Sequence, residues 1–149
     1  MATAREKPMT PASDQIMVVI RSANERTEKW CLECVAEQDA PGRVIIIRDH
    51  PFAKALTTGI DIALDADCQW TLFLDADILL TSSAIETFLF VAAPYDVFEI
   101  IPRALDRLWG EPISRGIHFY RTRYLQDARR HISLDPRISK PESHMVRRM

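Results

Sequence analysis

Short apolar runs alternate along this chain with segments in which apolar residues recur every three or four positions. The runs at 16–20, 44–47 and 70–74 are continuous and rich in Val, Ile, Leu, Phe and Trp. Such runs are typical of parallel strands that are buried on both faces. A fourth, less regular run covers 95–101. We expect these four segments to form strands of one sheet.

The segments between these strands predict helices. Apolar residues have the spacing of one buried helix face over 52–64, and a further helix is expected over 27–38. Ser83 and Glu86 have the spacing of a capping box, which predicts a third helix from there to about residue 93. Strands that alternate with helices predict an α/β protein, here a three-layer α/β/α arrangement around a mainly parallel sheet.

The pattern weakens after Pro102. It still predicts a short helix over 103–109, a strand over 116–120 and a helix over 122–132.

We expect one folded domain, over residues 15–132. Residues 1–14 contain two Pro and show no periodicity, so they predict a disordered tail. Residues 133–149 contain two Pro and four basic residues without a periodic pattern. They predict an irregular basic tail, which fits either a chain that ends early or a tail that orders on a partner.

Charge is unevenly distributed between the two parts of the chain. Residues 1–102 carry 8 Lys and Arg against 16 Asp and Glu, whereas residues 103–149 carry 11 against 5. A basic C-terminal part favours an anionic partner such as a diphosphate, an anionic lipid surface or a nucleic acid. The alternative is that the two parts complement each other within the fold.

The sequence also bears on the compartment. Residues 1–14 lack the apolar stretch of a secretory signal, and no apolar run has the length of a membrane span. The three Cys form no disulfide pattern. We expect a cytoplasmic protein, and peripheral attachment to the inner face of the membrane stays open.

The clearest candidate chemistry is Asp75 and Asp77, directly after the strand at 70–74. Ligands of open α/β sheets bind at the carboxyl ends of strands, and two carboxylates there suit a divalent cation that holds a diphosphate. With 12 Asp in the chain, about one Asp-x-Asp is expected by chance. Residues 64–67 repeat the four letters of 74–77, but only the second copy follows a strand.

Further polar residues follow the first two strands. Ser22, Asn24 and Glu25 come after the first strand and Asp49 after the second, where they would line a base and ribose pocket. Asn24 reads equally well as a helix cap and Asp49 as a turn residue. Lys54 is a candidate diphosphate contact, or an ordinary exposed helix lysine.

Several segments together resemble family-2-like glycosyltransferases of the GT-A type. They are 18–25 (VVIRSANE), 34–38 (CVAEQ), 53–63 (AKALTTGIDIA), 70–77 (WTLFLDAD) and, more weakly, 116–121 (GIHFYR). The resemblance implies a Rossmann-like, GT-A-type nucleotide-diphospho-sugar transferase. Its expected donor is a nucleotide-diphospho-sugar, and its acceptor is a glycan or another molecule that the sequence does not identify.

The resemblance also implies roles for individual residues. Asp77 would be the more direct ligand of Mn²⁺ or Mg²⁺, and Asp75 would reach the ribose as well as the ion. An inverting transfer needs a general base, for which Glu111, Asp127, Asp135 and Glu142 are candidates. The late pair, Asp135 and Glu142, is preferred only because the family places its base late in the chain.

One alternative to an enzyme stays open, and another is not favoured by the sequence. A truncated or non-catalytic relative would bind a nucleotide or a protein partner without transferring sugar. A nucleic-acid surface is not favoured, because Tyr120 and Tyr124 are the only aromatic residues among the Arg residues of 120–130.

Overall fold

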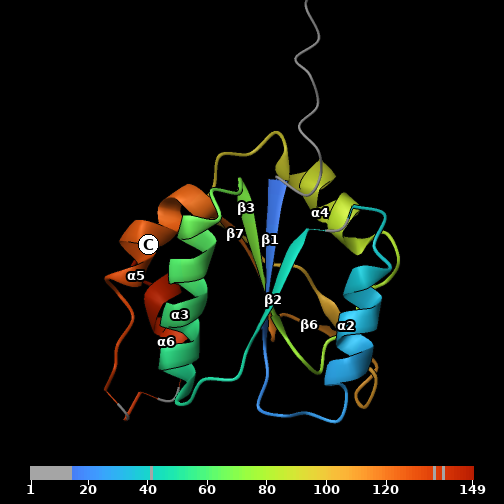
Figure 1. The fold of residues 1–149 in the computed structure, drawn as a ribbon, viewed down its shortest axis with the longest axis horizontal. Helices are drawn as coiled ribbons and strands as arrows, with labels where there is room; N and C mark the ends of the chain where they lie inside the picture. The colour runs from blue at the N-terminus through green and yellow to red at the C-terminus, as the bar shows by residue number, and fades with distance from the viewer. Residues whose placement is uncertain (1–14, 41, 136, 139) are drawn as a thin grey trace, which may run out of the picture.

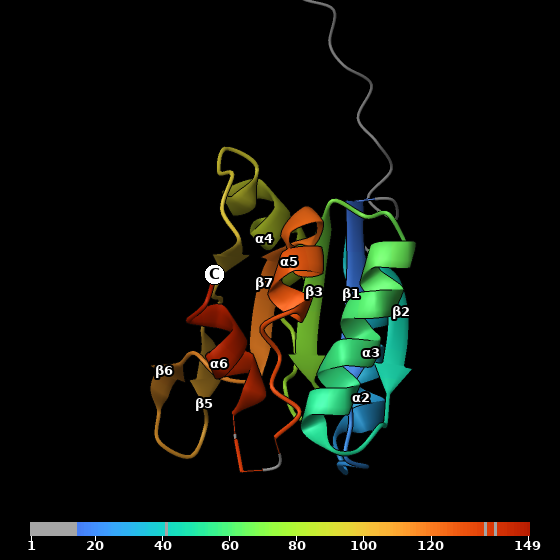
Figure 2. The ribbon, with the colours of Figure 1, turned by 90° about the vertical axis from the view of Figure 1, so that its left-hand side faces the viewer.

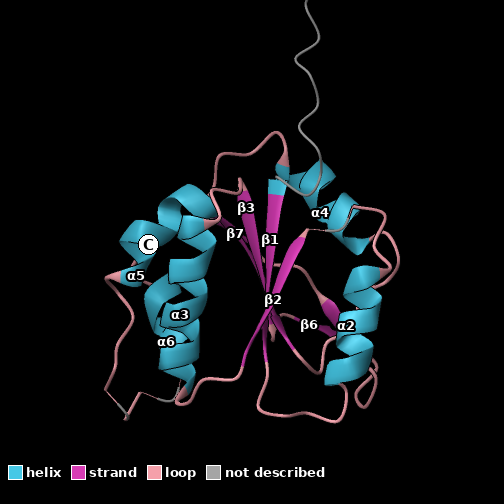
Figure 3. Ribbon diagram, in the orientation of Figure 1, coloured by secondary structure: helices cyan, strands magenta, loops and turns pink. Residues whose placement is uncertain are grey.

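The computed structural model of the chain describes residues 15–40, 42–135, 137–138 and 140–149. The tail expected over 1–14 lies outside the described residues. A central sheet carries helices on both of its faces (Figure 1 and Figure 3). The α/β class expected from the sequence is therefore confirmed.

The sheet has five strands in the order β2-β1-β3-β7-β4. Strands β1 (Ile16–Arg21), β2 (Arg43–Ile47) and β3 (Trp70–Asp75) pair in parallel. Strand β7 (Ile117–Arg121) runs antiparallel between β3 and the short strand β4 (Glu99–Ile100). The sheet is therefore mixed, with its three parallel strands at one side.

Five α-helices of the described residues cover the two faces. Helices α2 (Glu28–Ala36) and α4 (Ala84–Ala92) lie on one face, at the right of Figure 1. Helices α3 (Phe52–Asp65), α5 (Leu125–Arg129) and α6 (Pro141–Val146) lie on the other, at the left of the same view.

Each face of the sheet has its own hydrophobic core. Because successive side chains of a strand point to opposite faces, Val18 and Ile20 of β1 join the core beneath α2 and α4, whereas Val19 joins the core beneath α3 and α6. All three are fully buried. This double burial is why β1 and β3 read as continuous apolar runs rather than alternating ones.

The first three strands and three helices expected from the sequence are confirmed, and the first difference comes after α4. The strand expected over 95–101 is reduced to β4. The helix expected over 103–109 is wrong: β5 (Ala104–Asp106) and β6 (Glu111–Ile113) form a separate two-stranded sheet. The side chain of Asp106 accepts hydrogen bonds from turn amides, and Gly110 has a φ of 69°, so local turn chemistry prevails over helix propensity here.

The C-terminal part differs as well. The helix expected over 122–132 is divided into a 3₁₀ turn, η1 (Thr122–Tyr124), and α5. The tail expected to be irregular over 133–149 contains α6, whose Met145 is fully buried. Six residues are too few for a helical period to emerge from the sequence, and tertiary packing stabilises so short a helix.

Candidate functional site

The carboxyl ends of β1 and β3 meet where the strand order of the sheet reverses. The chain passes from β1 to β2 on one side and from β3 towards β4 on the other. Open α/β sheets bind ligands in the crevice outside such a switch point. Arg21 and Asp75, the last residues of the two strands, are partners in the parallel register. Figure 2 shows β1, β2 and β3 ending at the same end of the molecule.

Backbone hydrogen bonds hold the end of β3 in place. The amide of Asp75 donates to the carbonyl of Gly116 at 2.7 Å, and the amide of Ala76 donates to the carbonyl of Arg21 at 3.0 Å. Gly116 has a φ of 70°, and a Cβ at this position would lie 3.0 Å from Oδ2 of Asp75. The absence of a side chain at Gly116 therefore leaves room for the Asp75 carboxylate.

Arg21 is a buried cation between two carboxylates. Its guanidinium lies 2.8 Å from Oδ1 of Asp75 and 2.7 Å from Oε2 of Glu142. The ring of Phe52, at the start of α3, stacks on it with 4.7 Å between the guanidinium carbon and the ring centroid. Within the described part of the chain, Nε of Arg21 has no hydrogen-bond partner. Arg21 thus links both strand ends to α6.

Further polar contacts connect Glu142 to residues of β7 and β4. The hydroxyl of Tyr120 donates to Oε1 of Glu142 at 3.0 Å. His118 lies between two carboxylates, with Nε2 at 3.4 Å from Glu142 and Nδ1 at 2.6 Å from Glu99. Both oxygens of Glu142 are therefore engaged, so this carboxylate fixes Arg21 and is not free to act as a base while these contacts persist.

Burial and charge shift the proton affinities of these groups in different directions. Burial raises the pKa of the Asp75 carboxyl, and the charge of Arg21 opposes this only in part. Burial also disfavours ionisation of Glu142, but the charges of Arg21 and His118 prevail and lower its pKa. For His118, burial is outweighed by the hydrogen bond to Glu99 and the charge of Glu142, so its pKa is raised.

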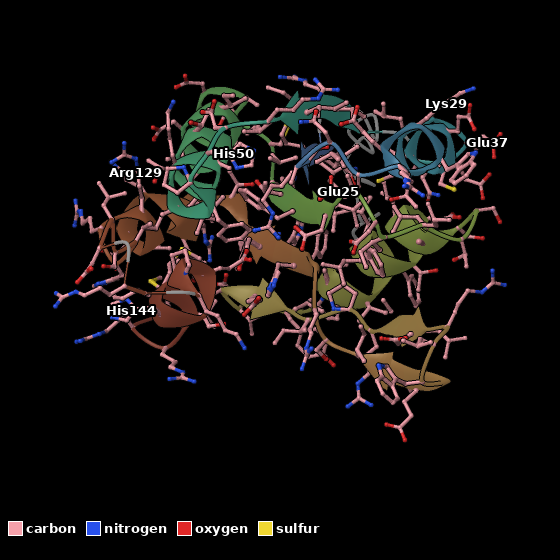
Figure 4. All side chains as sticks on the ribbon, turned by 90° about the horizontal axis from the view of Figure 1, so that it is seen from below. Glu25, Lys29, Glu37, His50, Arg129 and His144 are labelled. Atoms are coloured by element: carbon pink, nitrogen blue, oxygen red, sulfur yellow. The ribbon has the colours of Figure 1, made fainter. Side chains whose placement is uncertain are left out.

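The residues predicted after β1 form a closed turn. The hydroxyl of Ser22 accepts a hydrogen bond from the amide of Asn24 at 3.0 Å and donates to the carboxylate of Glu25 at 2.9 Å. Asn24 has a φ of 65°, a conformation that Asn tolerates in turns. Figure 4 looks onto this end of the sheet, with Glu25 near the middle of the view and Arg129 and His144 at the periphery.

The residues predicted after β2 lie together. Nζ of Lys54 lies 3.8 Å from Oδ1 of Asp49, and the hydroxyl of Thr58 donates to Oδ2 of Asp49 at 2.9 Å. The structure thus pairs the two predicted pocket residues with each other, at the end of β2 next to β1.

Asp77 has an exposed side chain that makes no hydrogen bond or ion pair within the described residues. The same part of the chain contains no cluster of three or more His, Cys, Asp or Glu that would hold a metal ion by itself. Mg²⁺ in nucleotide sites often uses only one or two carboxylates and takes its other ligands from phosphates and water. An ion held by Asp75 and Asp77 would therefore take most of its ligands from phosphates and water.

Of the four candidate bases, only Glu142 belongs to this network. Asp135 pairs with Arg137 two residues away, and Asp127 lies beside Arg130 in α5. Glu111 is exposed in β6. Sequence reasoning missed Arg21 and Glu99; the available signal for Arg21 was a charged residue that ends an otherwise apolar strand.

Comparison with known proteins supports the fold and not the family. No family model matches the chain, and no curated protein matches it. Among solved structures it is similar to one titled "Crystal Structure of A197 from STIV", with a TM-score of 0.57 and 14% identity, over 81% of this chain and 72% of that one. Likeness at this identity concerns the fold alone. The assignment to family-2-like glycosyltransferases is therefore wrong, because short motifs of common residues recur without common descent.

Proposed function

We propose that the crevice at the ends of β1 and β3 binds the diphosphate of a nucleotide-diphospho-sugar, and that the protein transfers the sugar to an acceptor. The observation that carries this proposal is the position of Asp75 and Asp77 at the switch point of the sheet. The proposal includes a finer description of the fold as a three-layer α/β/α nucleotide-sugar-binding domain.

In this proposal, different residues around the crevice bind different parts of the donor. Asp77 and Asp75 hold Mn²⁺ or Mg²⁺, which would neutralise charge on the departing nucleoside diphosphate. Ser22, Asn24 and Glu25 line the nucleoside from the turn after β1. Asp49 and Lys54 approach from the end of β2, with Lys54 directed to the diphosphate.

The transfer also needs a group that takes the proton of the acceptor hydroxyl. As the new glycosidic bond forms, the bond between the sugar and the diphosphate breaks, and the nucleoside diphosphate leaves with its electrons. Glu142 can accept that proton only by exchanging one of its present partners for the acceptor. Asp135 stays a prediction without a structural argument, because its contacts are local.

The test is calorimetric titration of UDP into the full chain, with and without Mn²⁺. We expect metal-dependent binding that is lost in Asp77→Asn. The matched control is Asp67→Asn, because Asp67 ends the first copy of the same four-letter motif, residues 64–67, away from the switch point. Asn also tolerates the positive φ of 52° at that position. Loss of binding in both variants would contradict a site at Asp77.

If folded protein binds none of UDP, GDP, CDP or dTDP, the proposal fails. A second candidate function is a nucleotide-binding protein without transferase activity. The observation that favours it is that both oxygens of Glu142 are already engaged. Metal-dependent UDP binding without sugar transfer or hydrolysis, measured across a panel of donors, would select this second candidate.

A further inference from the structure

The β5–β6 hairpin carries large apolar side chains that nothing in the described chain covers. Leu105 is 65% exposed, Leu108 83% and Trp109 75%. The hairpin forms its own small sheet, apart from the five-stranded one, and projects from the lower left of the molecule in Figure 2. Single exposed apolar residues need no explanation, but two adjacent ones at a projecting tip do.

Hydrogen bonds fix the shape of this tip. Oδ1 of Asp106 accepts from the amides of Leu108 at 2.8 Å and Trp109 at 3.2 Å. The amide of Gly110 donates to the carbonyl of Asp106 at 2.7 Å, with Gly110 in the left-handed region. The two apolar side chains are therefore presented by an ordered turn, which reduces the entropy lost when they are buried.

Three cations lie along the hairpin, Arg107 in its turn and Arg103 and Arg115 where its strands begin and end. Arg103, Arg107 and Arg115 are exposed and form no ion pair among the residues that the structure describes. Elsewhere in the chain Arg48 and Arg129 each pair with a carboxylate. Asp106 and the exposed Glu111 are partners in the β5–β6 register and carry negative charge beside the turn. Residues 103–115 hold three Arg against these two carboxylates, so the hairpin with its flanks keeps a net positive charge.

An anionic lipid surface fits this combination better than a protein or a nucleic acid. A stable protein interface buries about 800 Å² on each partner, more than two side chains at a hairpin tip supply. Nucleic acid would stack on Trp109 but would gain little from Leu105 and Leu108. Trp favours the membrane–water interface, aliphatic side chains enter the acyl region, and Arg binds anionic headgroups.

We propose that the β5–β6 hairpin docks on the surface of an anionic bilayer, with Leu108 and Trp109 inserted and Arg103, Arg107 and Arg115 at the headgroups. Among the described helices, none has the length and apolar character of a membrane span. The hairpin leaves the sheet between β4 and β7, and Gly116, just before β7, contacts Asp75. Docking therefore holds the candidate site close to the lipid surface.

The test is co-sedimentation of the full chain with vesicles of phosphatidylglycerol and phosphatidylcholine, compared with vesicles of phosphatidylcholine alone. We expect binding only to the anionic vesicles, weakened by salt. The double variant Leu108→Ser/Trp109→Ser should bind at least about tenfold more weakly. The control is Phe90→Ser, which removes a side chain that is 81% exposed on α4, outside the hairpin; it should bind like the parent protein.

Tryptophan fluorescence supplies a second readout. In a Trp30→Phe background, which removes the other exposed indole, only Trp109 and the buried Trp70 remain. Anionic vesicles should shift the emission to the blue, and the shift should disappear with Trp109→Phe.

Four results would overturn the proposal. The first is that the protein binds no vesicles, and the second is that it binds both vesicle types equally. The third is that Phe90→Ser weakens binding as much as the hairpin variant does. The fourth is that the protein binds no vesicles but self-associates or binds an oligonucleotide, and that the hairpin variant abolishes this association. None of these outcomes depends on whether a nucleotide binds at Asp77.

Discussion

At the residue scale, Arg21 defines the chemistry of the candidate site more than any acidic residue does. A guanidinium buried with two carboxylates is stable only while all three charges are present, because an unpaired buried charge is strongly unfavourable. The Asp-x-Asp motif drew attention to Asp75 and Asp77, but the structure differentiates them. Asp75 is engaged by Arg21, whereas Asp77 is exposed.

We predict a pH dependence of stability that originates at His118. Its pKa is raised in the folded protein, so its contribution is fully present below the unfolded pKa of about 6.5 and is lost as the pH rises through the folded value. Glu99, Glu142, Arg21 and Tyr120 are the charged and titratable groups around it.

Urea unfolding measured between about pH 6 and pH 9 checks this prediction. The free energy of unfolding should decline over this range in the parent protein, and the decline should be smaller in His118→Gln. His50→Gln, which changes an exposed histidine, should retain it. An unchanged pH profile in His118→Gln would show that the ion pairs of His118 contribute no stability.

At the scale of elements, α4 shows how a correct helix prediction can rest on a wrong cause. Its N-cap residue Ser83 makes no side-chain capping bond. The amide of Ile85 instead donates to Oε1 of Gln38, just beyond the end of α2, at 3.0 Å, and Gln38 Nε2 donates to the carbonyls of Cys34 and Thr81 at 2.8 Å each. A buried side chain from another element thus satisfies the start of α4.

We therefore predict that Gln38→Leu destabilises the protein by about 2 kcal/mol, because it leaves a buried amide and two carbonyls without their partner. Ser83→Ala should stay within about 0.5 kcal/mol of the parent, although the sequence pattern names Ser83 as the cap. Denaturant unfolding of both variants measures the difference. If Ser83→Ala lost more free energy of unfolding than Gln38→Leu, Ser83 would be the cap of α4 and the prediction would be contradicted.

At the scale of the whole molecule, α6 completes both a core and the candidate site. Met145 fills the core beneath α3 and α5, and Glu142 pairs with Arg21 more than a hundred positions away in the sequence. The segment that the sequence pattern left as an irregular tail is thus part of the folded unit.

Deleting residues 140–149 should reduce the free energy of unfolding by at least about 3 kcal/mol, through the cavity left by Met145 and the lost partner of Arg21. Deleting only 147–149, which are exposed, should change it by less than about 0.5 kcal/mol. Chemical denaturation of the two truncated proteins tests this. Equal stability would mean that α6 packs without contributing.

The sequence by itself determined the α/β class, the three parallel strands and the helices between them. Strands buried on both faces and amphipathic helices each leave a pattern within a short stretch of sequence. The sequence also placed Asp75 and Asp77 after a strand and included Glu142 among the candidates. Tertiary structure alone decided the antiparallel insertion of β7 and the network of Arg21, Glu142, His118 and Glu99. Those features depend on contacts between distant segments, whose energies no local pattern records.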